Sequence, residues 1–206
     1  MKLLDLFSGT QSVTKQAIEL GFEATCLDRD LEADIETDIM DWDYKQYEPK
    51  HFDVIWASPP CTEYSIAKTT GIRDIEGANN IVKRTLEIIE YFQPKCFMVE
   101  NPQTGLLKHQ DFMQNLSYND VDYCKYLMPY RKRTRLWNNL RNWNPRPLCK
   151  KDCGSMDGNR HKETAQRMPS GKKETWGEHR QFRREELYNI PSELIKEILE
   201  SIISNN

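Results

Sequence analysis

The stretch Val54-Ile55-Trp56-Ala57-Ser58-Pro59-Pro60-Cys61 decides how this chain is interpreted, because an apolar run ends there in two prolines and a thiol. A second apolar run, Cys96-Phe97-Met98-Val99, leads directly into the carboxyl group of Glu100. Short apolar runs bounded in this way are typical of buried strands. Open α/β sheets place their functional sites at the carboxyl ends of such strands, so both runs indicate a site.

Strand-like and helix-like segments alternate on either side of these two runs. Gly21 follows one helical pattern and is a residue favoured just after a helix, while Pro94 follows another and excludes its continuation. The expected strands cover 2–7, 24–27, 52–57, 96–99 and the surroundings of 136–137, and the expected helices cover 13–20 and 79–92. This alternation predicts an α/β fold with a mostly parallel sheet and helices on both faces.

The chain changes character after about residue 140. Residues 1–140 are expected to form the catalytic, cofactor-binding core. Prolines, glycines and cysteines without apolar periodicity follow, so 141–187 is predicted to be a small irregular segment. Apolar residues at 194, 195, 198, 199, 202 and 203 have helical spacing, and 188–206 is expected to end in a helix that packs back on the core.

Composition indicates an aqueous and reducing compartment. No run in the 206 residues approaches the roughly 18 apolar residues of a membrane span. The apolar strand that begins at Lys2 leaves no place for a signal peptide. Three of the six cysteines lie in or beside apolar runs, which favours buried thiols over a disulfide framework. We therefore expect a cytoplasmic protein that has no membrane partner.

Charge is distributed unevenly, although the net charge of −3 gives no overall signal for a nucleic-acid partner. Residues 28–53 are strongly acidic, and residues 125–184 are rich in Lys and Arg. An acidic half and a basic half are compatible with a cofactor side and a polyanion side. Two solvated faces would explain the same pattern equally well.

Asp5-Leu6-Phe7-Ser8-Gly9 predicts a strand that runs into a glycine turn and then a helix. Such a turn lets backbone N–H groups approach a ligand near the helix N-terminus. Asp28 ends the next strand, where nucleotide-binding α/β folds place the carboxylate that holds a ribose. Asp38-Ile39 offers a contact to an adenine edge, and a solvated loop acid is an equal alternative for Asp38.

Cys61 and Glu100 supply two groups that together can activate an electron-poor ring. The thiol is a nucleophile that can add to the ring, and the carboxyl group is an acid that can protonate it. The alternative for Cys61 is an inert buried thiol. Its position after two prolines at a strand end favours the catalytic interpretation and therefore an enzyme.

Four motifs occur in order along the chain and together resemble the DNA cytosine-5 methyltransferase family. They are Asp5-Leu6-Phe7-Ser8-Gly9, Ser58-Pro59-Pro60-Cys61-Thr62-Glu63-Tyr64-Ser65, Val99-Glu100-Asn101-Pro102 and Arg133-Thr134-Arg135. The resemblance covers roughly the first 140 residues and implies a Rossmann-like, S-adenosylmethionine-dependent methyltransferase fold. It departs at Tyr130, where the family has Gln, and at Tyr188-Asn189-Ile190-Pro191, a loose match to the family's last cofactor motif.

The resemblance implies a role for each candidate site residue. Residues that would contact S-adenosylmethionine are Phe7, Ser8, Gly9 and Thr10 around the pocket, Asp28 at the ribose, Asp38 and Ile39 at the adenine, and Pro59. Residues that would act on cytosine are Cys61 as the nucleophile on C6, Glu100 at N3 and the exocyclic amine, Arg135 at O2, and Arg133 in support of Arg135.

The activity implied is methyl transfer from S-adenosylmethionine to C5 of a flipped-out cytosine in DNA, through a covalent adduct between Cys61 and C6. The short segment after residue 140 implies a reduced target-recognition region. Two alternatives stay open: methylation of cytosine in RNA or in a free cytidine nucleotide, and a non-catalytic regulator that binds S-adenosylmethionine or DNA. The presence of Cys61, Glu100 and Arg135 together argues against the regulator.

The irregular segment carries a candidate zinc site. Cys149, Cys153 and His161 are ligand types that Zn²⁺ prefers, and they follow one another at short spacing. Zinc would staple a small loop-rich module, with His179 as a candidate fourth ligand; three unrelated side chains are the alternative. Basic residues with Trp176 among them also suit phosphate contacts and base stacking, unless the segment is a solvated loop.

Overall fold

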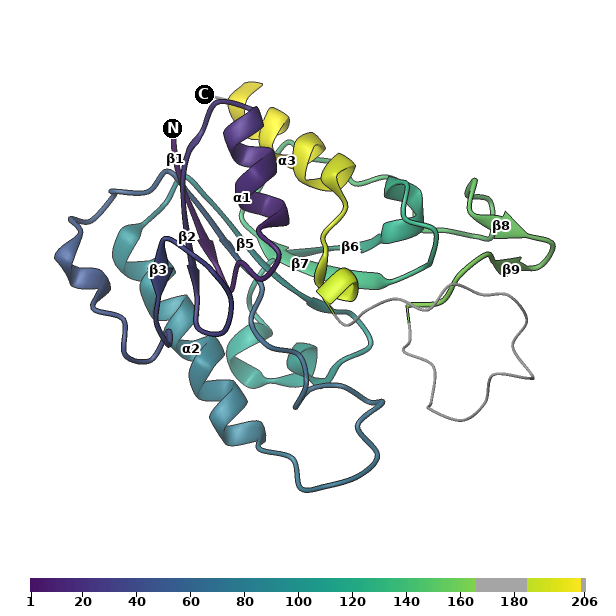
Figure 1. Ribbon diagram of the computed structural model, residues 1–206, viewed down its shortest axis with the longest axis horizontal. Helices are drawn as coiled ribbons and strands as arrows, with labels where there is room; N and C mark the ends of the chain where they lie inside the picture. Colours follow the sequence, from purple (N-terminus) through teal and green to yellow (C-terminus); the bar gives the residue numbers. More distant parts are fainter. Residues whose placement is uncertain (166–184, 205–206) are drawn as a thin grey trace.

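A seven-stranded sheet forms the centre of the computed structural model, which describes residues 1–165 and 185–204 (Figure 1). The strand order is β3-β2-β1-β4-β5-β7-β6, and β7 runs antiparallel to both of its neighbours while the first five strands are parallel. The strands are β1 (Lys2–Leu6), β2 (Glu23–Asp28), β3 (Ile35–Glu36), β4 (Val54–Ala57), β5 (Cys96–Pro102), β6 (Tyr118–Asp122) and β7 (Arg133–Asn138). The predicted fold class is confirmed.

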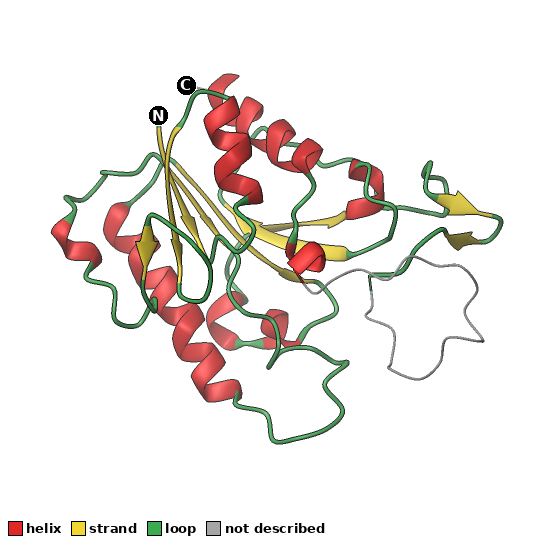
Figure 2. Ribbon diagram, viewed as in Figure 1, coloured by secondary structure: helices red, strands yellow, loops and turns green. Residues whose placement is uncertain are grey.

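The three α-helices of the described residues cover the two faces of this sheet (Figures 1 and 2). Helices α1 (Ser12–Glu19) and α3 (Ser192–Ser204) pack together on one face, and α2 (Ile75–Phe92) packs on the other. Helix α2 begins four residues before the predicted start because Asp74 caps it: the Asp74 carboxylate accepts a hydrogen bond of 2.8 Å from the N–H of Gly77. Each helix buries an apolar stripe against the sheet.

An aromatic cluster takes the place of a helix between β3 and β4. Trp42, Tyr44 and Phe52 are almost fully buried and pack against Tyr91 and Phe92 at the end of α2. Aromatic side chains bury large areas, so this connection covers the same face of the sheet as α2 without an α-helix. Short 3₁₀ helices occur here and elsewhere, at η1 (Tyr44–Gln46), η2 (Leu106–His109), η3 (Asp111–Met113), η4 (Tyr123–Tyr126) and η5 (Glu185–Tyr188).

The far edge of the sheet differs from the expectation. Strand β6 was not predicted, and β7 begins three residues before Leu136. Both strands carry charged residues that pair across the ladder, where Asp122 lies opposite Arg133 and Asp120 lies opposite Arg135. Opposite charges on facing strand positions stabilise such a pair, although β6 and the start of β7 have too little apolar content to be recognised from the sequence.

The segment after β7 is irregular where it is described, apart from a short antiparallel pair, β8 (Met156–Asp157) and β9 (Arg160–His161). The predicted division at residues 140 and 187 stays a prediction. His179 and Trp176 lie outside the described residues. Within residues 1–165 and 185–204, no helix has the length and apolar character that crossing a membrane would require.

Candidate active site

A cavity of about 480 Å³ opens at the carboxyl ends of the central parallel strands. Strand β1 lies between β2 and β4, so the connections from this point run in opposite directions along the sheet. Open α/β sheets bind ligands at this switch point. The volume lies within the range of cofactor and small-molecule sites, which is about 300–1,000 Å³.

The glycine turn after β1 forms one wall of the cavity. Phe7, Gly9 and Gln11 all have left-handed backbone conformations, with φ of 61°, 53° and 59°. Only glycine adopts this conformation without strain, and strain of this kind is concentrated at functional sites. Phe7, Ser8 and Gly9 line the cavity. Thr10 is not among the lining residues; its hydroxyl donates a hydrogen bond to the side chain of Asn189.

Asp28 organises the loops at the end of β2. One carboxylate oxygen accepts a hydrogen bond of 2.9 Å from the N–H of Gly9, and the other accepts from the N–H groups of Asp30 and Leu31 at 2.9 and 3.0 Å. Asp28 also lines the cavity, so these hydrogen bonds shape the cavity wall.

Asp38, Ile39 and Pro59 also line the cavity. Asp38 pairs with Arg29 at 3.1 Å, and sequence analysis missed that arginine as a lining residue. Ile39 is almost fully buried and offers an apolar surface beside the acids. Carboxylates beside an apolar wall suit a ligand that has hydroxyl groups, an amine and a flat ring.

Asp5 lies beneath this wall and is 1% exposed. Burial raises the pKa of Asp5 to about 7, although the N–H and the hydroxyl of Thr14 both donate hydrogen bonds to it and lower the value. Asp5 is also among the lining residues. The cavity therefore contains a carboxyl group that titrates near neutral pH.

Cys61 and Glu100 line the same cavity from two neighbouring strands. Cys61 follows β4, Glu100 lies in β5, and the two strands pair in parallel with Ala57 opposite Val99. Asn101 joins the two strand ends: it is fully buried, and its side-chain amide donates a hydrogen bond of 2.9 Å to the carbonyl oxygen of Pro59. The structure thus brings the predicted nucleophile and acid together.

Two residues that sequence analysis missed contact Glu100. The Tyr123 hydroxyl donates a hydrogen bond of 3.1 Å to Oε1 of Glu100, and the Lys132 ammonium lies 3.8 Å from the same oxygen. Burial and the nearby Glu100 charge raise the pKa of Tyr123 well above its ordinary value, so this hydroxyl remains a donor. Lys132 lines the cavity beside Glu100. Only its place in the basic run before Arg133 could have indicated it.

Arg133 and Arg135 are not among the residues that line the cavity. Each makes a bidentate ion pair through Nε and Nη2. Arg133 binds the two carboxylate oxygens of Asp122 at 3.0 and 2.7 Å, and Arg135 binds those of Asp120 at 2.7 and 2.9 Å. The Arg135 guanidinium also lies 3.5 Å from the ring centre of Tyr118. A contact from Arg135 to a base therefore stays a prediction, and Arg135 would have to exchange Asp120 for the base to make it.

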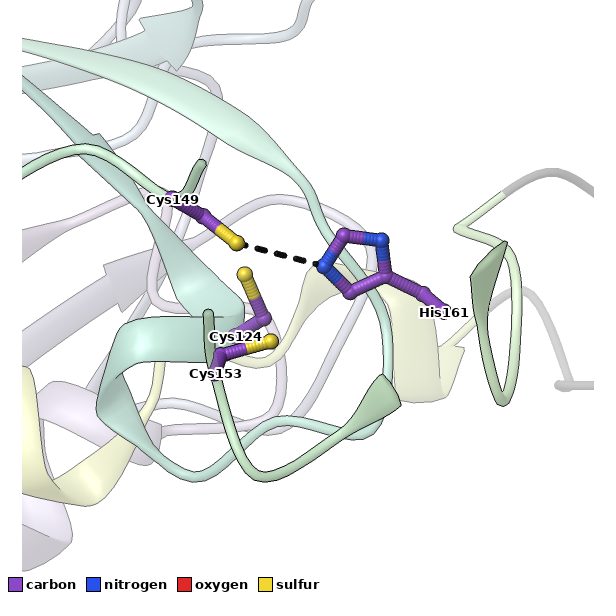
Figure 3. Close-up of side chains that lie close together, drawn as sticks. All are labelled: Cys124, Cys149, Cys153 and His161. Carbon is purple, nitrogen blue, oxygen red and sulfur yellow. Dashed lines mark hydrogen bonds between the residues drawn. The ribbon is translucent and has the colours of Figure 1, made fainter. Parts of the chain in front are cut away.

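The structure brings the three predicted zinc ligands together and adds a fourth. Cys149, Cys153 and His161 converge with Cys124, which comes from η4 and was not singled out (Figure 3). The ligand atoms all lie within 4.8 Å of one another. The candidate fourth ligand, His179, lies outside the described residues.

The loose motif before α3 also reaches the cavity. Tyr188 and Ile190 are lining residues, and the N–H of Ile190 donates a hydrogen bond to the Ser12 hydroxyl. The segment before α3 thereby contributes to the cavity wall. A contact of this segment with the cofactor stays a prediction.

Comparisons with known proteins agree with this geometry. A family model described as C-5 cytosine-specific DNA methylase matches residues 1–126. A "Probable DNA (cytosine-5)-methyltransferase" of Frog virus 3 (isolate Goorha) is 36% identical over 223 aligned positions, which cover 97% of this chain and 99% of that protein.

A solved structure supports the fold. It is a prophage-encoded candidate DNA modification methyltransferase of E. coli, matched with a TM-score of 0.55 at 16% identity. The match covers 72% of this chain and 52% of that one, so the chain spans about half the length of this structural relative. The family match and the viral relative together establish that the chain belongs to the C-5 cytosine-specific DNA methylases, a family of methyltransferase enzymes.

Proposed function

We propose that this protein transfers a methyl group from S-adenosylmethionine to C5 of cytosine in DNA, through a covalent adduct between Cys61 and C6. The observation that carries the proposal is the shared cavity of Cys61 and Glu100, at the ends of adjacent parallel strands tied together by Asn101. Family membership supports the same reaction.

S-adenosylmethionine, when bound, supplies an electrophilic methyl group on a sulfonium sulfur. The Phe7–Gly9 turn would surround it, Asp28 would hold the ribose hydroxyls, and Asp38 with Ile39 would face the adenine. Pro59 would contact the cofactor beside Cys61. Thr10 would support the cofactor pocket without contacting the cofactor, because its hydroxyl donates a hydrogen bond to Asn189, in the segment that precedes α3.

Carbon C5 of cytosine is too weak a nucleophile to accept a methyl group unaided, and Cys61 would make it more nucleophilic. Attack of the Cys61 thiolate on C6 forms a carbon–sulfur bond and moves ring electrons toward N3 and O2, so C5 becomes enamine-like and can accept a methyl group. The sulfonium that gave the methyl group would leave as a neutral thioether. Loss of the C5 proton to solvent and cleavage of the bond between Cys61 and C6 would then restore the ring and the thiolate.

Glu100 would hydrogen-bond N3 and the exocyclic amine, where charge develops as the adduct forms. Tyr123 and Lys132 both contact Oε1 of Glu100. Oε2 would then be the oxygen that faces the base. Held from one side in this way, Glu100 is oriented before the base arrives.

The polymer partner in this proposal is DNA with a flipped-out cytosine, because a stacked base is out of reach of Cys61. A second bound group, Zn²⁺, is assigned to the cluster of Cys124, Cys149, Cys153 and His161.

Arg135 would contact O2 of the base, supported by Arg133.

Methyl transfer from radiolabelled S-adenosylmethionine to duplex DNA, single-stranded DNA, RNA and dCMP, side by side, tests the proposal. We expect label at cytosine C5 in DNA, and none with Cys61→Ala, which should still bind the cofactor. Label in RNA alone or in dCMP alone would show that the substrate is RNA or the free nucleotide, and not DNA. Turnover by Cys61→Ala would remove the nucleophile assignment, and cofactor binding without transfer to any substrate would favour a regulator.

A further inference from the structure

We propose that Cys124, Cys149, Cys153 and His161 bind one structural Zn²⁺, and that this metal holds the Tyr123 wall of the active site in place. The cluster joins three parts of the chain: η4, the loop after β7, and β9. Figure 3 shows the four side chains pointing toward one another. The metal site stands independently of the reaction, whereas its effect on catalysis rests on the proposed function.

The ligand set and its spacing match tetrahedral zinc. Three thiolates and one imidazole are a common set for structural Zn²⁺, with Zn–S of about 2.3 Å and Zn–N of about 2.0 Å. Tetrahedral geometry then places a ligand sulfur and nitrogen about 3.5 Å apart. The Cys149 sulfur lies 3.5 Å from Nε2 of His161, and all four ligand atoms lie within 4.8 Å of one another.

Neighbouring groups orient the ligands. The N–H of Lys151 donates a hydrogen bond to the Cys149 sulfur at 3.3 Å, from a left-handed backbone conformation with φ of 69°. The ion pair between Lys125 and Asp152, at 2.8 Å, connects the residue after Cys124 with the residue before Cys153. Outer contacts of this kind fix metal ligands and tune their charge.

Three consecutive residues link this cluster to the catalytic acid. Asp122 is fully buried and accepts hydrogen bonds from Arg133 and from the N–H of Cys149, the latter at 2.9 Å. Tyr123 donates to Glu100, and Cys124 is the metal ligand. A metal that fixes Cys124 and Cys149 therefore fixes both sides of Tyr123, which in turn positions Glu100.

A disulfide is the competing use of the same thiols. Three sulfurs this close could pair two at a time, but no disulfide is present among the described cysteines. A disulfide also gives no role to His161, whose Nε2 lies against the Cys149 sulfur. The complete donor set favours a metal.

Metal analysis of the purified full chain tests the site directly. We expect one zinc per chain after reconstitution with Zn²⁺ under reducing conditions, and X-ray absorption should show three sulfur ligands and one nitrogen. Co²⁺ in place of zinc should give the absorption bands of tetrahedral thiolate coordination. Absence of bound zinc, a shell without sulfur, or a disulfide among these three cysteines in metal-free active protein would overturn the assignment.

Variants test the connection to catalysis. Cys124→Ser should lose zinc and lower kcat roughly tenfold or more. The affinity for S-adenosylmethionine should change little, because the proposed cofactor contacts lie at or after the ends of β1, β2, β3 and β4 and not in the metal cluster. The matched control is Cys96→Ser, a partly buried cysteine outside the cluster, which should keep one zinc and its activity.

A conservative replacement separates positioning from a general loss of structure. His161→Ala should lose zinc, and His161→Cys should recover zinc and much of the lost kcat through four thiolates. Unchanged kcat in a folded, zinc-free variant would overturn the positioning role. If the wild-type chain transfers no methyl group, the stoichiometry and the Co²⁺ spectrum still decide the metal site, so failure of the proposed function is distinguishable.

Discussion

Replacing Asp5 with Asn should make the stability of this protein less dependent on pH. Burial raises the pKa of Asp5 from 3.8 to about 7. Between these values the folded protein retains a proton that the unfolded chain has lost, so the free energy of unfolding falls as pH rises. The stabilising contribution of the protonated Asp5 is complete below about pH 4 and is lost as pH rises through about 7.

The size of the effect follows from the shift. Each pKa unit corresponds to about 1.4 kcal/mol, so a shift of about three units corresponds to about 4 kcal/mol over the whole titration. Between pH 5 and pH 8 the wild-type protein should lose about 2–3 kcal/mol more than Asp5→Asn. The amide oxygen of Asn can still accept the hydrogen bonds from Thr14, so the substitution removes mainly the titration.

Urea unfolding at pH 5, 6, 7 and 8 measures this difference as the change in midpoint times the m-value. Asp53→Asn is the matched control. Burial opposes ionisation of Asp53, but the N–H of Lys2 and the Lys95 ammonium hold the pKa of that carboxyl below its usual value. Its difference from wild type should therefore stay constant over this range. If the free energies of unfolding of wild type and Asp5→Asn changed in parallel between pH 5 and pH 8, Asp5 would not be the group that makes stability depend on pH.

Four further changes test the site. Asp28→Asn should raise the Kd for S-adenosylmethionine roughly tenfold or more, measured by calorimetry, since hydrogen bonds to a charged group are worth about 1.5–3 kcal/mol; an unchanged Kd would place the ribose elsewhere. Asn101→Ala should destabilise the fold by about 1–3 kcal/mol by freeing the carbonyl of Pro59, and an unchanged urea midpoint would contradict this. Glu100→Gln should lower kcat roughly 100-fold or more in the methylation assay, and an unaltered rate would exclude it from the mechanism. Lys132→Met should lower kcat with little effect on cofactor affinity, and equal kcat would remove Lys132 from the active site.

The centre of the sheet could be predicted because its strands are buried on both faces. Val54–Ala57 is fully buried, so its sequence is continuously apolar, and the polar residues that follow mark the strand end. The same reasoning placed Cys61 and Glu100 together, since neighbouring parallel strands end at one edge.

The antiparallel edge could not be predicted in this way. Asp120 and Asp122 form ion pairs with the arginines opposite them on β7. This pairing depends on the register between the two strands, which the sequence of either strand alone does not reveal. Paired strand residues share a face, so Arg135 lies on the side of Asn101 while Leu136 lies opposite Glu100. Lys132 lines the cavity, whereas Arg133 and Arg135 do not, and only the three-dimensional structure shows this difference.

Cys124 illustrates the same limit at the zinc cluster. It lies 25 residues before Cys149, inside Tyr123-Cys124-Lys125-Tyr126, where no spacing rule indicates a ligand. The other three ligands follow one another closely and could be found from the sequence. The chain fold supplies the fourth when η4 is brought against the loop after β7.

The covalent adduct at Cys61 is the central claim, and trapping it is the most direct test. Duplex DNA with 5-fluorocytosine carries fluorine where a proton must leave C5, so the adduct cannot resolve after methyl transfer. With S-adenosylmethionine present, we predict a protein–DNA complex that survives denaturation, is absent with Cys61→Ala, and maps by mass spectrometry to the peptide that contains Cys61. Methyl transfer to ordinary DNA without any trapped complex, or a complex mapped to another residue, would contradict the account.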